Sequence, residues 1–169
     1  SYEIIKLEGE TRGQAETVAI ALKNRHSKTP LTIFNIDTFR PNFTFPEIES
    51  MEDGYLEVFE GQGENWSFAK PLNDQDTLVI ETAEKSAISN LCSTGLYYFS
   101  RASDFLDAFY RYVEKPKIEW AKGELYVAPL YNILIQKGLK IHFNLIKRDE
   151  VVFCGIPSEY NDFISSDGN

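Results

Sequence analysis

The pattern of hydrophobic and polar residues predicts a strand, a helix and a second strand in the first part of the chain. Residues 2–7 read YEIIKL, which is typical of a short strand. Thr11, followed three positions later by Gln14, fits a capping box at a helix start. Apolar side chains then recur over residues 15–22 at the spacing of one helix face. Residues 31–36, LTIFNI, form a continuous apolar run, which is typical of a strand buried on both faces.

The remainder of the chain predicts several strands and two further helices. One helix is expected at residues 102–113, and another at 129–137, with Pro129 in its first turn and Gly138 after its end. Strands are expected at 54–60, 66–69, 78–80, 95–99, 141–146 and 151–153. Helix–strand alternation followed by a run of strands predicts an α/β fold with an open mixed sheet.

Composition limits the classes of protein to consider. The 169 residues are 43% hydrophobic, enough for one domain with one core over residues 1–169. The 17 Lys and Arg against 26 Asp and Glu give a net charge of −9, which disfavours binding to nucleic acid or to an anionic membrane. No apolar run reaches the roughly 20 residues of a membrane span. Cys92 and Cys154 cannot form a disulfide framework, so we expect buried thiols in a cytoplasmic protein.

A few polar residues stand where ligands often bind. Asp37 follows the predicted strand 31–36, and a carboxylate at the end of a strand suits Mg²⁺, although position alone favours an Asp that caps a turn. The residues 13–15 at a helix start offer backbone N–H groups to a base or an anion, or serve as an ordinary cap. Residues 93–95 could present hydroxyls to a ligand or simply begin a strand. Neither histidine lies in a nucleophile or metalloprotease signature.

Taken in order, five segments resemble the sugar-nucleotide pyrophosphorylase family, which comprises nucleotidyltransferases with a GT-A-like α/β fold. The segments are residues 13–18 (GQAETV), 33–37 (IFNID), 66–70 (WSFAK), 83–85 (AEK) and 93–99 (STGLYYF). The resemblance runs from about residue 5 to about residue 160 and is greatest to small bacterial members associated with capsule or lipopolysaccharide sugars. It implies an open mixed, mostly parallel sheet flanked by helices.

The resemblance also implies where the nucleotide and its metal bind. Gly13, Gln14 and Ala15 match the family segment whose backbone recognises the base. Asp37 matches the aspartate that holds Mg²⁺ on the phosphates and is implied to be catalytic.

The same resemblance implies a sugar site. Glu84 and Lys85 match the family's Glu-Lys pair, which contacts the sugar and its phosphate, and Lys85 is implied to be catalytic as well. Thr94 and Gly95 match the strand that touches sugar hydroxyls. Ser67 falls where a small residue lets the sugar approach the sheet.

The implied reaction needs no protein nucleophile. A sugar 1-phosphate attacks the α-phosphorus of an NTP, pyrophosphate leaves, and a nucleotide-sugar for polysaccharide biosynthesis is formed. Alignment and charge neutralisation by Mg²⁺, Lys and Arg supply most of the catalysis. The absence of a Ser, Cys or His signature is therefore consistent with the implied enzyme.

The chain departs from the family pattern in two ways. The family's glycine-rich loop, which carries an Arg, would precede Ser1, so residues 1–169 are expected to be the C-terminal two thirds of a catalytic domain and to turn over poorly alone. A second metal ligand of many members falls at Pro129 here, and Asn132 replaces it only if the local register differs.

Two other functions stay open from the sequence. A GT-A glycosyltransferase would share the sheet, although Asn35 and Asp37 form only half of its usual acidic pair. A non-catalytic nucleotide- or sugar-binding domain would keep the sheet without the loop. The base, the sugar and the formation of a homo-oligomer are not determined by the sequence.

Overall fold

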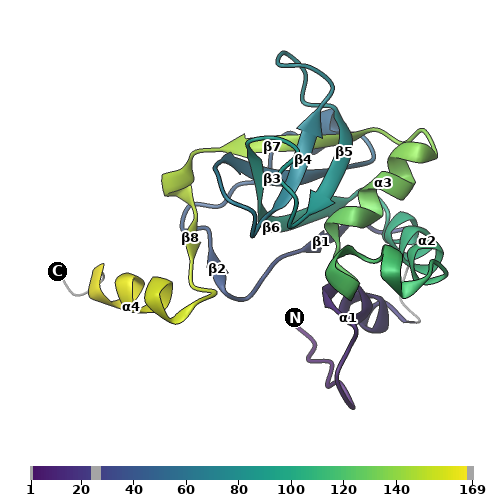
Figure 1. Cartoon of the computed structure of the whole chain (residues 1–169), viewed down its shortest axis with the longest axis horizontal. Coiled ribbons are helices and arrows are strands. Elements are labelled where there is room, and N and C mark those ends of the chain that lie inside the picture. Colours follow the sequence, from purple (N-terminus) through teal and green to yellow (C-terminus); the bar gives the residue numbers. More distant parts are fainter. Residues whose placement is uncertain (1, 24–27, 167–169) are drawn as a thin grey trace.

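The computed structural model describes residues 2–23 and 28–166, which surround a six-stranded sheet (Figure 1). The helices are α1 (Gln14–Ala21), α2 (Ala102–Val113), α3 (Ala128–Gln136) and α4 (Pro157–Ser166). The strands are β1 (Leu31–Ile33), β2 (Thr38–Phe39), β3 (Gly54–Glu60), β4 (Ser67–Pro71), β5 (Val79–Glu84), β6 (Leu91–Phe99), β7 (Ile141–Ile146) and β8 (Val152–Phe153). Short 3₁₀ turns are η1 (Ile48–Met51), η2 (Lys117–Glu119), η3 (Ala121–Gly123) and η4 (Arg148–Glu150).

The sheet is open and mixed, as predicted, but most of its strand pairs are antiparallel. Its order is β5-β4-β6-β3-β7, with β1 paired to β6. Within the described chain, β3 and β7 form the one parallel pair. The prediction of a mostly parallel sheet was therefore wrong. Strands β4 and β5 form a hairpin, whose consecutive strands run antiparallel, and β6 runs antiparallel to β1, β3 and β4.

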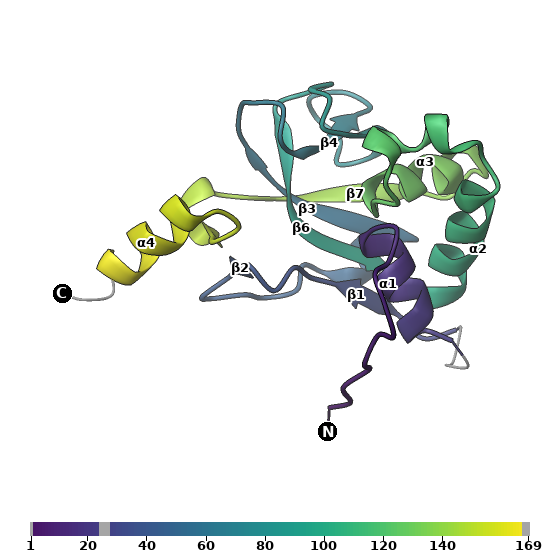
Figure 2. The ribbon, with the colours of Figure 1, turned by 60° about the horizontal axis from the view of Figure 1, so that its bottom comes forward.

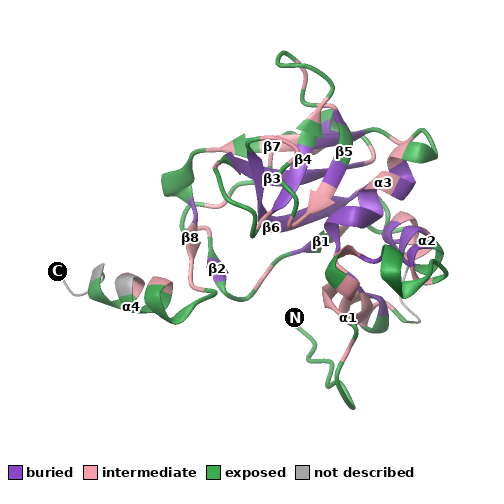
Figure 3. Ribbon diagram, viewed as in Figure 1, coloured by how far each residue is buried: buried purple, intermediate pink, exposed green. Residues whose placement is uncertain are grey.

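Three helices cover one face of the sheet. Helices α1, α2 and α3 lie together on that side in both views (Figures 1 and 2), and their inward residues are buried (Figure 3). The ring of Tyr131 stacks on Phe99 with centroids 4.6 Å apart, and its hydroxyl donates to the carbonyls of Tyr55 and Tyr98. The packing and these bonds join α3 to the centre of the sheet. The opposite face is covered by the segment around Met51.

Several predicted elements have the expected bounds. The helix at 102–113 and the strands at 54–60 and 141–146 are α2, β3 and β7. Residues 2–7 do not form the predicted strand, because none of the described strands forms a ladder with them, and Tyr2 is 90% exposed. The predicted capping box is also wrong. Helix α1 begins at Gln14, its N-cap is Gly13, and no side chain caps it.

The strand predicted at 31–36 is half as long as expected. Only β1 (Leu31–Ile33) forms, and it lies beside β6 alone among the described strands. Ile36 is 98% exposed, so burial on both faces was wrong for this segment. Asp37 consequently lies in the turn between β1 and β2, not at the end of a buried strand.

A two-stranded ribbon and a terminal helix were not predicted as such. Strand β2 pairs antiparallel with β8, and α4 follows β8 and stands away from the sheet (Figures 1 and 2). Cys154 lies in this region and is half-buried, which corrects its expected burial, whereas Cys92 is buried as predicted. None of the helices in the described chain is long and apolar enough to cross a membrane.

Candidate active site

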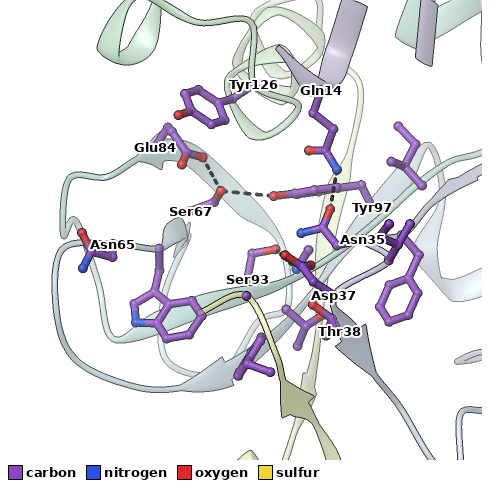
Figure 4. Close-up of a pocket in the computed structure, with 18 of the residues that line it drawn as sticks. Gln14, Asn35, Asp37, Thr38, Asn65, Ser67, Glu84, Ser93, Tyr97 and Tyr126 are labelled. Atoms are coloured by element: carbon purple, nitrogen blue, oxygen red, sulfur yellow. Dashed lines mark hydrogen bonds between the residues drawn. The ribbon is translucent and has the colours of Figure 1, made fainter. Parts of the chain in front are cut away.

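A cavity of about 870 Å³ gathers most of the predicted site residues (Figure 4). Its walls come from α1, the β1–β2 turn, residues 62–67, the end of β5, the middle of β6 and the start of α4. The predicted residues that line it are Gln14, Asp37, Ser67, Glu84, Thr94 and Gly95. Segments from both ends of the chain therefore meet at one site.

Asp37 is held by its backbone while its carboxylate stays accessible. Its carbonyl accepts the N–H of Cys154 at 2.8 Å, and its side chain is exposed within the cavity wall. A methyl group added to Gly155 would lie 3.3 Å from Oδ2 of Asp37 and 3.9 Å from Oε2 of Glu159. The two carboxylates thus flank Gly155. Glu159 also accepts the N–H groups of Gly155 and Ile156, which caps the start of α4.

The residues around Asp37 fit an oxygen-liganded divalent cation. Among the described residues no three His, Cys, Asp or Glu side chains converge on one point. Mg²⁺ in nucleotide sites is usually held by one or two carboxylates together with substrate phosphates and water. Asp37, with Glu159 close by, matches that donor set.

A chain of hydrogen bonds ends at the predicted sugar-contacting carboxylate. The hydroxyl of Ser67 donates to Oε2 of Glu84, and the Tyr97 hydroxyl lies 3.1 Å from the Ser67 oxygen (Figure 4). The Ser67 hydroxyl has one proton, which it donates to Glu84. Tyr97 is therefore the donor in its bond with Ser67. Burial, and the charge of Glu84, raise the pKa of Tyr97 to about 12. The phenol therefore stays protonated and able to donate.

Partial burial also changes the ionisation of Glu84 itself. Burial raises the pKa of this carboxyl, against the lowering effects of the Ser67 hydroxyl and the Lys85 charge. A carboxyl whose pKa is raised in the folded state stabilises the fold at pH values below its ordinary pKa. This contribution is lost as the pH rises through the raised pKa.

We expect Glu84→Gln, which cannot titrate, to show this effect as a difference from wild type. The free energy of unfolding of wild type, relative to Glu84→Gln, should fall as pH rises from ~4 to ~7. Urea unfolding of both proteins across that range measures it. Glu81→Gln, which removes an exposed carboxylate from the same strand, is the control variant. A difference that stays constant or grows with pH would contradict the assignment.

Lys85 lies beside the cavity, and its contact with Tyr126 links it to the cavity wall. Its Nζ donates to the hydroxyl oxygen of Tyr126 at 2.6 Å and lies 4.8 Å from the centre of that ring. The hydrogen bond raises the pKa of Lys85, so the amine is held in its charged form. Lys85 adopts a φ of 52°, which turns the chain sharply after β5. Tyr126 is one of the residues that line the cavity.

Only one residue of the predicted base-recognising turn reaches the cavity. The amide of Gln14 donates to Oδ1 of Asn35 at 2.5 Å (Figure 4). Gly13 and Ala15 pack instead against Leu125, and the N–H of Ala15 donates to the Leu125 carbonyl at 2.9 Å. The N–H of Ala15 is therefore occupied within the fold, and the accessible recognition group is the Gln14–Asn35 pair.

Two residues of β6 shape the cavity without offering a free donor. The Thr94 hydroxyl donates to the buried Glu57 at 3.0 Å. Gly95 has a φ of +89°, and a side chain there would collide with the Asn35 amide. Gly95 therefore leaves the space that Asn35 occupies, and Thr94 contributes to the wall rather than a free hydroxyl proton.

Asn132 does not lie near Asp37. Its amide bonds to the backbone of Thr82 in both directions, at 2.8 and 2.7 Å, and so ties α3 to β5. It lines a second cavity of about 480 Å³, together with Pro129. Asn132, the substitute expected only if the local register differs, therefore lines a different cavity from Asp37.

The predicted site residues did not include several polar residues that line this cavity, among them Asn35, Tyr97, Tyr126 and Glu159. Asn35 and Tyr97 lie inside recognised segments and could have been included on that basis. Tyr126 and Glu159 had no local signal, because chain segments distant in sequence bring them to the site.

The cavity is acidic. Its charged lining residues are Asp37, Glu64, Glu84 and Glu159, with no Lys, Arg or His among the described residues of its wall. A phosphorylated ligand would therefore meet four carboxylates. Its binding requires cations from a metal or from groups outside this wall.

Comparison with known proteins identifies the family. No family model and no curated protein matches the chain. A solved structure of the nucleoside-diphosphate-sugar pyrophosphorylase from Vibrio cholerae RC9 is 59% identical to it and superposes with a TM-score of 0.87. The match covers 94% of this chain and 67% of that protein. The chain belongs to the nucleoside-diphosphate-sugar pyrophosphorylase family.

More distant structures share the fold of this pyrophosphorylase family member. A UDP-glucose pyrophosphorylase complexed with UDP-glucose has a TM-score of 0.72 at 13% identity, with 93% of this chain and 64% of that one covered. A UTP-bound UGPase from Acinetobacter baumannii has a TM-score of 0.67 at 12% identity, with 95% and 58% covered. The chain thus spans about two thirds or less of the length of these proteins.

Proposed function

We propose that this pyrophosphorylase family member takes part in Mg²⁺-dependent transfer of a nucleotidyl group from an NTP to a sugar 1-phosphate. The products are a nucleotide-sugar and pyrophosphate, in the supply of precursors for a polysaccharide such as capsule or lipopolysaccharide. The observation that carries the proposal is one cavity that joins Asp37, the Gln14–Asn35 pair and the Ser67–Glu84 pair. The Vibrio cholerae relative and the UTP and UDP-glucose complexes of distant relatives support the substrate class.

The atoms of the reaction balance without a protein nucleophile. A phosphate oxygen of the sugar 1-phosphate forms a bond to the α-phosphorus of the NTP. The bond from that phosphorus to the bridging oxygen breaks, and pyrophosphate leaves with the electron pair. The chain therefore has to align the two substrates and offset their negative charge.

Asp37 is the residue we assign to the metal. When bound, Mg²⁺ supplies positive charge that offsets the phosphate oxygens and the leaving pyrophosphate. Asp37 holds its carboxylate in the cavity through its backbone bond to Cys154. Four carboxylates line the wall and would repel a triphosphate. The positive charges of the cation and of Lys85 offset this repulsion.

Glu84 and Lys85 are the residues we assign to the sugar phosphate. Ser67 occupies Oε2 of Glu84, which leaves Oε1 as an acceptor for a hydroxyl group. Polyhydroxylated ligands donate such bonds. Lys85, held charged by Tyr126, suits the phosphate at the other end of the same ligand.

Pyrophosphate release with a panel of NTPs and sugar 1-phosphates tests this function. The Vibrio cholerae relative serves as a reference, and calorimetry measures NTP binding by this chain with and without Mg²⁺. We expect Mg²⁺-dependent NTP binding and only slow formation of a nucleotide-sugar, since residues 1–169 alone are expected to turn over poorly. Sugar transfer from an intact nucleotide-sugar without pyrophosphate would instead identify a glycosyltransferase. Equal, metal-independent binding by wild type and Asp37→Ala would identify a non-catalytic binding domain.

Replacement of Tyr126 by Phe should weaken the use of sugar 1-phosphate. The ring contact with Lys85 remains, but the hydrogen bond to its ammonium is lost. A bond to a charged group of about 1.5 kcal/mol corresponds to an increase in KM for sugar 1-phosphate of roughly tenfold. Steady-state kinetics at saturating NTP measure it. Tyr110→Phe, on the exposed side of α2, is the control. An unchanged KM would show that Tyr126 does not position Lys85.

A further inference from the structure

A buried ion pair lies directly behind the cavity wall. Arg40 contacts Glu57 through two parallel bonds, Nε to Oε1 at 2.8 Å and Nη2 to Oε2 at 3.1 Å. The two side chains are 5% and 0% exposed. Glu57 sits in the middle of β3 and also accepts the Thr94 hydroxyl. Thr94 is itself a lining residue, so the pair supports the cavity from inside the core.

Burial of this pair is not explained by stability. The exposed pair of Arg101 and Asp53, with side chains 51% and 30% exposed, is of the ordinary surface type. Removing two charges from water is costly, and apolar side chains of similar size often stabilise a core equally well or better. A two-bond Arg–carboxylate contact instead fixes the relative position of the segments that carry it.

Arg40 connects the sheet to both strands of the ribbon β2–β8. It follows β2 directly, and its Nη1 donates to the carbonyl of Glu150 in η4, just before β8 begins. The ribbon is only two residues long on each side, with Thr38 opposite Phe153. One guanidinium therefore holds both strands at the same end of the ribbon.

The other end of that ribbon carries the metal-site carboxylates. Asp37 precedes β2, and its carbonyl accepts the N–H of Cys154, which follows β8. Gly155 comes next, and the carboxylates of Asp37 and Glu159 flank it. A shift of the ribbon relative to β3 would therefore move Asp37 along the cavity wall. Phe153 also packs on Trp66 at 4.8 Å and on Phe59 of β3 at 5.5 Å, so apolar contacts act together with the ion pair in holding the ribbon against the sheet.

We propose that Arg40, paired with Glu57, is a positioning residue that locks the β2–β8 ribbon to the central strand and so sets where Asp37 lies in the cavity. This role in holding the ribbon, called the lock below, rests on the contacts of Arg40 with Glu57 and with the carbonyl of Glu150. Its consequence for metal-dependent nucleotide binding rests on the proposed function of Asp37.

Amide hydrogen exchange of the full chain tests the lock without metal or substrate. The key variant is Arg40→Met with Glu57→Leu, which leaves no unpaired buried charge and should keep the global stability near that of wild type. We expect the Cys154 amide to exchange about tenfold faster or more, while the Leu56 amide in β3 is unchanged. Unchanged Cys154 exchange in this folded double variant would overturn the proposal.

Arg40→Lys provides a second variant that retains the buried charge. It loses the two-bond geometry and the Glu150 contact, so Cys154 exchange should rise by less than in the double variant. The matched control is Arg101→Met, which breaks an exposed pair and should leave Cys154 exchange unchanged. Wild-type exchange in Arg40→Lys, or faster Cys154 exchange in Arg101→Met, would also overturn the proposal.

Calorimetry of NTP binding with Mg²⁺ separates this proposal from the proposed function. If the lock positions a metal-site residue, the double variant and Asp37→Asn should both weaken Mg²⁺-dependent binding. If neither weakens binding but Cys154 exchange still rises, the lock stands and the metal role of Asp37 is wrong.

Discussion

Asp37→Asn is expected to reduce Mg²⁺-dependent nucleotidyl transfer by about a hundredfold or more, because a metal supplies several kcal/mol of charge stabilisation. The amide has nearly the same shape but no charge. The bond from Cys154 goes to the Asp37 backbone carbonyl, so the fold around the turn should be kept. Rates of pyrophosphate release at increasing Mg²⁺ measure the effect, which should include a shift to higher Mg²⁺.

The control for this experiment removes a carboxylate elsewhere. Asp74 lies in the exposed loop between β4 and β5, outside the cavity wall, so Asp74→Asn should leave rate and Mg²⁺ dependence unchanged. Circular dichroism of each variant checks the fold. If Asp37→Asn retains wild-type Mg²⁺ dependence, then Asp37 is not the metal residue of the reaction.

Gly13→Ala is expected to lower the free energy of unfolding by about 2–4 kcal/mol, through a backbone clash and a strained φ. Gly13 has a φ of +141°, and an added Cβ would lie 2.7 Å from the Leu125 carbonyl oxygen and 2.8 Å from its nitrogen. Backbone atoms cannot rotate away as a flexible side chain can. Relief requires α1 to separate from the segment that also carries Tyr126. Urea unfolding followed by circular dichroism measures the loss.

Gly138→Ala separates the clash from the cost of the backbone angle. Gly138 has a φ of +85°, but an added Cβ would have nothing within 4 Å. We expect a loss of about 1 kcal/mol there. Equal losses at Gly13 and Gly138 would show that the contact with Leu125 is not rigid.

Elements with a strong local pattern were predictable from sequence. Helix α2 has a clear apolar face at residues such as Phe105 and Phe109, and its bounds were predicted. Strands β3 and β7 were predicted with the same accuracy. The prediction for residues 2–7 was wrong although their pattern is typical of a strand. A strand requires a hydrogen-bonding neighbour, which local pattern does not reveal.

The candidate site was predictable only in part. The order of five short segments indicated Asp37, Ser67 and Glu84, and these residues do line one cavity. The same reasoning offered Asn132 as a second metal ligand if the local register differed, whereas its amide bonds to the backbone of Thr82. Residue spacing along the chain does not show which side of a helix faces a site, so the position of Asn132 required the packed fold.

The amino-acid sequence by itself determined the family and the α/β class. The tertiary structure alone decided which groups surround Asp37 and what holds them there. Glu57 reads as one polar residue in an alternating strand, yet it is fully buried and paired with Arg40. Glu159 lies 122 positions after Asp37, yet both carboxylates flank Gly155. Such contacts depend on which distant segments pair in the folded chain, where tertiary context overrides the local pattern.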